Sequence, residues 1–140
     1  MYSAPADAAL YKGKGRDDPR VKIRMLANQQ SVTFCKPRNF EVRFDDKDRT
    51  SPRFKDNDKL NTMKLPLKQM ENGRWRFMQH FTGQSEKKSK VDIDIVGSLN
   101  AALTRARGWF RFSVVLGPDE SLPEGTRGTS GKVRWRVKLR

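Results

Sequence analysis

The sequence KVRWRVKLR, residues 132–140, alternates strictly between basic and apolar side chains. A period of two residues is typical of a β-strand, because successive side chains point to opposite faces of a sheet. One face of this strand is therefore apolar and suited to a core, and the other is basic. The cations on the basic side of this strand, with no acid among them, are Lys132, Arg134, Arg136, Lys138 and Arg140.

Two further segments repeat this alternation of cations with apolar residues. One begins at Arg20, and the other follows Asn72-Gly73. That dipeptide favours a two-residue type I′ hairpin, because both residues tolerate positive φ. Such a turn would place Lys68 opposite Phe77. The outward cations of the two segments are Arg20, Lys22, Arg24, Arg74 and Arg76.

More strand-like segments begin at Ser31, Phe40, Val91 and Trp109. Between the last two, a capping serine at position 98 and a terminating glycine at 108 predict one short helix near residues 98–107. We therefore expect a mainly β fold, either a β-barrel or a two-sheet sandwich, with this single helix. A β-α-β unit over residues 91–116 would instead make the fold α+β.

The first 19 residues are mostly small or basic and predict a flexible N-terminal arm. Residues 20–140 then form a single β-rich domain, since 140 residues is the usual size of one domain. Tyr2, Leu10 and Tyr11 would allow the arm to contact a neighbouring copy. Residues 45–62, rich in polar side chains, predict a long surface loop.

The chain carries 30 Lys and Arg against 16 Asp and Glu, a net charge of +14. Such a charge attracts polyanions, and nucleic acid above all. The single cysteine, Cys35, excludes an intrachain disulfide framework and a Cys-rich zinc site. Residues 1–16 lack the pattern of a secretory signal, and no stretch is apolar enough to cross a membrane. We expect a cytoplasmic or nuclear protein, or one inside a virion, and not a secreted one.

Aromatic residues add a second hint of nucleic-acid binding. Trp109 and Arg111 lie on the side of their strand opposite the apolar residues that suit a core. An exposed Trp beside an Arg can stack an unpaired base and hold its phosphate. The alternative explanation, and the more frequent role of a Trp at such a place, is a second core or a subunit contact. Trp75 and Trp135 fall on apolar faces, and we expect both in the core.

Acidic residues are unevenly placed, around Glu41 and Asp45 and on the outward face that holds Asp92 and Asp94. Separate acidic and basic faces favour contacts between copies of a chain. The alternatives are a divalent cation at Asp92 and Asp94, or a metal nuclease that adds Glu41. His80 has no recognisable catalytic context, and no phosphate-binding glycine motif is present. We predict no enzymatic activity, no cofactor and no metal.

The predicted function is that of a non-enzymatic, nucleic-acid-binding, self-assembling structural protein. A viral capsid, nucleocapsid or matrix-type protein is the leading form, with RNA favoured over DNA and a homo-oligomer or lattice as the assembly. A monomeric cellular RNA-binding or ribosome-associated module and a matrix protein on an anionic membrane surface are the alternatives. The predicted nucleic-acid contacts are Arg20, Lys22, Arg24, Arg74, Arg76, Trp109, Arg111, Lys132, Arg134, Arg136, Lys138 and Arg140.

Overall fold

The computed structural model describes residues 8–35, 37–45, 53–54, 63–85, 87–118, 120 and 122–140. These residues form strands and turns and contain no helix. The strands are β1 (Ala9–Gly15), β2 (Lys22–Ala27), β3 (Ser31–Phe34), β4 (Phe40–Glu41), β5 (Arg43–Phe44), β6 (Arg53–Phe54), β7 (Met63–Pro66), β8 (Lys68–Gln69), β9 (Trp75–Gln84), β10 (Lys90–Leu99), β11 (Arg105–Val115), β12 (Arg127–Thr129) and β13 (Val133–Leu139).

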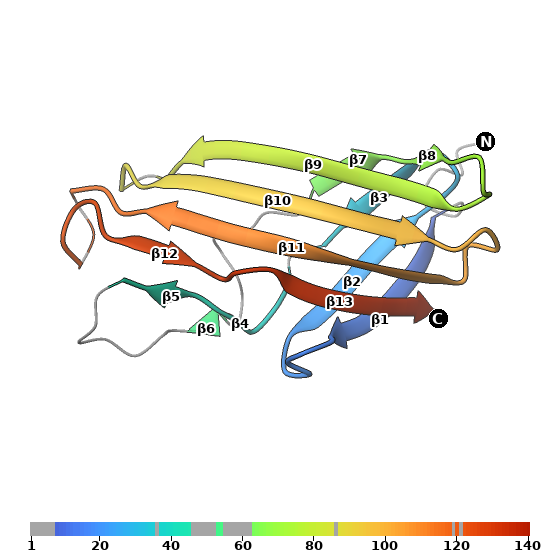
Figure 1. The fold of residues 1–140 in the computed structure, drawn as a ribbon, viewed down its shortest axis with the longest axis horizontal. Helices are drawn as coiled ribbons and strands as arrows, with labels where there is room; N and C mark the ends of the chain where they lie inside the picture. The colour runs from blue at the N-terminus through green and yellow to red at the C-terminus, as the bar shows by residue number, and fades with distance from the viewer. Residues whose placement is uncertain are drawn as a thin grey trace.

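Eleven strands belong to one antiparallel sheet, whose main path runs in the order β7-β3-β2-β1-β13-β11-β10-β9-β8. The two ends of this path, β7 and β8, are consecutive in the chain and are separated only by Leu67. The sheet therefore curls until its ends approach each other. In Figure 1, β1, β2, β3 and β7 lie behind β9, β10 and β11. The prediction of a mainly β, barrel-like domain is confirmed.

The core fills the space between the two walls of the barrel, one formed by β1, β2, β3 and β7 and the other by β9, β10 and β11. Phe34 of β3 contacts Trp135 of β13 and Phe110 of β11, with ring centroids 5.4 and 6.4 Å apart. Trp135 is fully buried, as predicted, and stacks on Phe77 at 6.2 Å. Trp75, also predicted in the core, packs against it while only partly buried. Aromatic contacts across the barrel therefore hold its opposite walls together.

Glycines make room for this aromatic layer. A row of mutually paired residues on the inner face reads Phe77, Gly97, Gly108, Trp135 and Gly15 across five strands. A Cβ atom at Gly97 would lie 2.1 Å from Cζ of Phe77, and one at Gly108 would lie 2.8 Å from Cζ2 of Trp135. The large rings thus lie directly over backbone that carries no side chain, and only glycine leaves that space free.

The predicted helix at residues 98–107 is wrong, and so are the α+β alternative and its β-α-β unit. β10 and β11 form an antiparallel hairpin, joined by a tight turn over residues 100–104. The side chain of Asn100 stabilises this turn in place of a helix. Its Oδ1 accepts hydrogen bonds from the backbone N–H groups of Thr104 and Arg105, at 2.8 and 3.1 Å. Leu103 takes a positive φ of 57°. Local bonding by an Asn side chain competes with a helix in this way.

The Asn72-Gly73 turn forms a hairpin, but the predicted register is wrong by one residue. Lys68 pairs with Arg76 rather than with Phe77. The backbone N–H of Met70 donates to the carbonyl of Arg74, which leaves a three-residue loop with Gly73 at φ 86°. Three-residue hairpins place a glycine in the left-handed region after a type I turn. The shift puts Lys68 on the outer face, with the other cations.

The predicted N-terminal arm is corrected over Ala9–Gly15, which is strand β1 between β2 and β13. Tyr11 is 2% exposed, and its hydroxyl donates to the carbonyl of Leu103. Small residues let β1 fit at a crowded position: a Cβ at Gly13 would meet the backbone of Arg136. The rest of the predicted arm contact, Tyr2, lies outside the described residues, as do most of residues 45–62.

Candidate functional site

Cations form an unbroken series across the outer face of the sheet, because the strand register aligns them. Starting at β2, directly paired residues run through β1, β13, β11, β10 and β9 to β8. All but one of these seven positions are basic, the exception being Ser98 on β10. We call this series the long basic row: Lys22, Lys14, Arg136, Arg107, Ser98, Arg76 and Lys68.

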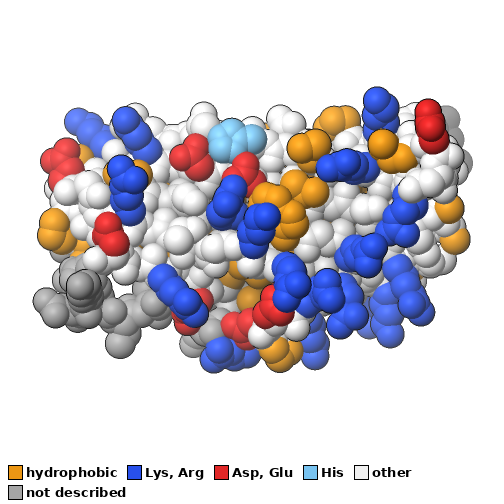
Figure 2. All heavy atoms as spheres, in the orientation of Figure 1, with side chains coloured by type: hydrophobic (Ala, Val, Ile, Leu, Met, Phe, Trp, Pro, Cys, Tyr) orange, Lys and Arg blue, Asp and Glu red, His pale blue; other side chains and the backbone are white. Residues whose placement is uncertain are grey.

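A second, shorter series runs parallel to the first, two residues along each strand. Paired residues on β2, β1, β13 and β11 are all basic. We call this series, Arg24, Lys12, Lys138 and Arg105, the short basic row, and the two rows together the basic face. Figure 2 shows basic side chains gathered where β1, β11 and β13 lie in Figure 1.

A groove of about 1000 Å³ follows this face. Residues from both rows line it, together with Arg16, Arg74 and Arg140. Among the described residues that line the groove there is no acid. The groove is therefore an open, strongly positive channel rather than an enclosed pocket for a small molecule.

The register places like charges directly opposite one another, with about 5 Å between Cβ atoms of paired residues. Two unit charges about 7 Å apart in water repel by about 0.6 kcal/mol, so each row is mildly repulsive. Within the described part of the chain, none of the ten cations of the two rows forms an ion pair. A bound polyanion would relieve this repulsion.

Ten of the twelve predicted contacts fall into two groups, and the other two, Trp109 and Lys132, contact each other. Most of them belong to the basic face or line its groove, including Arg74, whose Nε donates to Ser98 Oγ at 3.3 Å. Three predicted cations are instead neutralised by neighbouring carboxylates. These pairs are Arg20 with Asp18 at 3.0 Å, Arg111 with Asp94 at 3.1 Å, and Arg134 with Asp17 at 2.6 Å.

Sequence reasoning missed half of the cations of the basic face. Lys12 and Lys14 fall in the predicted arm, and Arg105 and Arg107 fall in the predicted helix. The wrong hairpin register hid Lys68. A usable signal was present: Lys12-Gly-Lys14-Gly and Arg105-Ala-Arg107-Gly alternate cations with small residues. Small inner residues did not stand out as apolar, although the crowded interior requires them.

Beside the long basic row lies an apolar strip made of Trp109, Val96 and Met78, which pair directly across β11, β10 and β9. Met78 is 58% exposed and Trp109 is partly buried. Two cations approach the indole ring: Lys132 Nζ lies 4.7 Å from its centroid and Arg111 Cζ lies 5.6 Å from it. Figure 2 shows a hydrophobic patch in this part of the face, next to basic side chains.

On the far side of this strip, acids predicted to mediate self-assembly are engaged within the molecule. Asp94 Oδ1 lies 2.5 Å from His80 Nδ1, and Asp94 Oδ2 accepts a hydrogen bond from Arg111 Nη2 at 3.1 Å. The hydrogen bond to Asp94 raises the pKa of His80. Although partial burial acts in the opposite direction, the hydrogen bonds from His80 and Arg111 lower the pKa of Asp94. Asp92 lies 3.5 Å from His80 Nε2.

The remaining predicted acids lie elsewhere. Glu41 of β4 pairs with Arg43 at 2.8 Å, and Asp45 Oδ1 accepts from the backbone N–H of Arg127 at 3.0 Å. Within the described ranges no cluster of His, Cys, Asp and Glu could hold a metal ion. Glu41 is therefore not brought together with Asp92 and Asp94 into the metal site of a nuclease.

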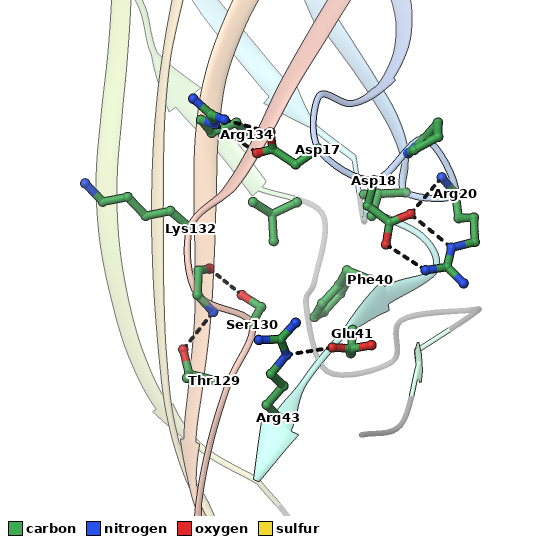
Figure 3. Close-up of a pocket in the computed structure, with 14 residues that line it drawn as sticks. Asp17, Asp18, Arg20, Phe40, Glu41, Arg43, Thr129, Ser130, Lys132 and Arg134 are labelled. Carbon is green, nitrogen blue, oxygen red and sulfur yellow. Dashed lines mark hydrogen bonds and ion pairs between the residues drawn. The ribbon is translucent and has the colours of Figure 1, made fainter. Parts of the chain in front are cut away.

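A second cavity of about 610 Å³ lies between residues 17–21, strands β4 and β5, and residues 129–134 (Figure 3). Unlike the groove, it is lined by acids as well as bases. The ion pairs on its wall are Arg134–Asp17, Arg20–Asp18 and Arg43–Glu41. Because neighbouring acids balance three of its cations, this cavity attracts a polyanion less than the basic face does.

We compared the chain with models of protein families, with curated proteins and with solved structures, and none of the three comparisons finds a match. In the described part of the chain, no helix is long and apolar enough to span a membrane. What defines the class of this protein is thus its own fold and surface: an antiparallel, nearly closed β-sheet with one basic outer face.

Proposed function

We propose that this protein binds nucleic acid without catalysis, through the phosphates that lie along its basic face. The observation that carries the proposal is the long basic row. Its six cations come from strands far apart in sequence, and the register aligns them with no acid between them. A series of regularly spaced cations suits a ligand with regularly spaced anions, and the phosphate backbone is such a ligand.

Two simpler explanations of these cations fit the surface less well. Pairing with acids inside the molecule accounts for Arg20, Arg111 and Arg134, but the described acids leave the basic face unpaired. A merely solvated surface would mix its charges, because mixing lowers repulsion. Segregation of cations onto one groove, and of carboxylates elsewhere, supports a polyanionic ligand instead.

Self-assembly into a coat or lattice stays a separate prediction. Ala9–Gly15 is a strand inside the sheet and Tyr11 is buried, so neither can reach out to a neighbouring copy. Nucleic-acid binding by the basic face does not depend on assembly, and a monomer would use the same groove.

The test is a salt series with labelled RNA and DNA oligonucleotides of mixed sequence. We expect binding that weakens steeply with salt and depends little on sequence, because phosphate contacts release counterions and carry no base information. Fluorescence anisotropy measures the affinity, and light scattering on the same samples reports the mass of the protein. Affinity that does not change with salt, or no binding at low salt, would refute the proposal. A mass above the monomer would support assembly, and a monomer under all conditions would contradict it.

A further inference from the structure

We infer that the preferred ligand is a single strand whose unpaired bases pack on the apolar strip while its phosphates lie along the long basic row. This inference rests on the proposed function and narrows it to one class of nucleic acid. It assigns a role to the outer-face apolar side chains of Trp109 and Val96, which are partly exposed, and of Met78, which is exposed; phosphate binding alone leaves them without one.

The geometry places the two surfaces side by side on one face. Trp109 follows Arg107 by two residues on β11, and Met78 follows Arg76 by two on β9. Val96 lies between them on β10. Residues two apart in a strand point to the same face and are about 7 Å apart. A nucleic-acid strand whose phosphates bind along the long basic row can therefore place its bases on the apolar strip.

The side chains of the apolar strip suit contact with a flat, partly polar ring. Met78 is 58% exposed, and a thioether side chain adapts its shape to an aromatic ligand. Lys132 Nζ and Arg111 Cζ lie 4.7 and 5.6 Å from the centroid of the Trp109 indole in cation–π contacts. Arg111 is paired with Asp94, so the positive charge at this edge of the strip comes from Lys132, which forms no ion pair with a described acid. Bases pack well on aromatic side chains and need no particular sequence to do so.

Two other ligands fit the basic face and the strip less well than a single strand. A duplex buries its base faces in its own stack, so it would contact the basic rows and leave the strip unused. A flat anionic membrane would meet not only the rows but also the carboxylates of Asp92 and Asp94 just beyond the strip. A single strand follows the row and leaves these acids outside its path.

The experiment compares an unstructured single-stranded RNA with a duplex that carries the same number of phosphates. The variants are Trp109→Ala and Met78→Gln, and Met70→Gln is the matched control, because Met70 is exposed at the β8–β9 hairpin outside the strip. Met78→Gln changes only an exposed side chain, so it stays informative should Trp109→Ala fail to fold. Vesicles of anionic lipid form a third arm of the experiment.

We expect the wild type to bind the single strand more tightly than the duplex. Trp109→Ala should weaken single-strand binding about tenfold, with a smaller loss for Met78→Gln, while duplex binding and the Met70→Gln control change less than about twofold. Equal affinity for the two ligands, or equal losses on both, would overturn the inference and leave the proposed function standing. No binding to either would refute both. Binding to vesicles that depends on Trp109, without single-strand binding, would assign the strip to a membrane instead.

Discussion

Replacing Arg107 and Arg136 together by glutamine tests whether the aligned row, rather than the net charge, binds the ligand. The two residues lie opposite each other on β11 and β13, in the middle of the long basic row. Both side chains are exposed, and neither pairs with a described acid. Glutamine removes the charges without introducing new ones, so the change leaves the core and the register intact.

The size of the effect follows from the number of phosphates engaged. If each of the six cations of the row meets one phosphate of a single strand, the slope of log affinity against log salt is about −4. The double variant keeps four cations, and its slope should be about −3. Between about 50 and 200 mM salt, the wild type then loses about 300-fold in affinity and the variant about 50-fold.

Fluorescence anisotropy with a labelled single-stranded oligonucleotide measures both slopes. The matched control is Lys90→Gln with Arg127→Gln, which removes two exposed cations at the opposite end of β10 and on β12. Thermal unfolding should show the row variant to be as stable as the wild type or slightly more so, because a mutual repulsion is removed. If the control flattens the slope as much as the row variant, net charge alone drives binding and the reasoning fails.

Two further predictions concern the fold and the acidic end of the outer face. Gly97→Ala should lower the free energy of unfolding by about 1–3 kcal/mol, because the new Cβ would lie 2.1 Å from Phe77 Cζ. Urea denaturation measures this loss. Gly83→Ala is the control, because a Cβ at Gly83 meets nothing within 4 Å. His80 should titrate above the ordinary histidine pKa of about 6.5 in an NMR titration, because Asp94 stabilises the protonated ring, and Asp94→Asn should bring the pKa back down. Since the folded-state pKa is raised, its contribution to stability is complete below the unfolded pKa and is lost as pH rises through the folded value. A His80 pKa at or below the ordinary value would show that the pair does not form.

The strands were the most predictable part of this fold, and two segments show why the rest was not. Residues 98–107 satisfy helical spacing through Leu99 and Leu103, yet the side chain of Asn100 bonds to the backbone and turns the chain. Beyond Leu10 and Tyr11, residues 9–15 hold only Ala, Lys and Gly, and the segment therefore resembles an arm. They form a central strand because bulky residues from other strands fill the interior around them.

By itself, the sequence determined that the protein is mainly β, that its last strand has one apolar and one basic face, and that its charge favours polyanions. These properties depend on local alternation and on composition, which are visible along one chain. Only the tertiary structure decided which cations share a surface. The strand order and register align Lys14, Arg107 and Arg136 on one face, whereas Arg134 forms an ion pair with Asp17. Neighbours in a sheet are set by pairing between distant segments, and no local pattern contains that information.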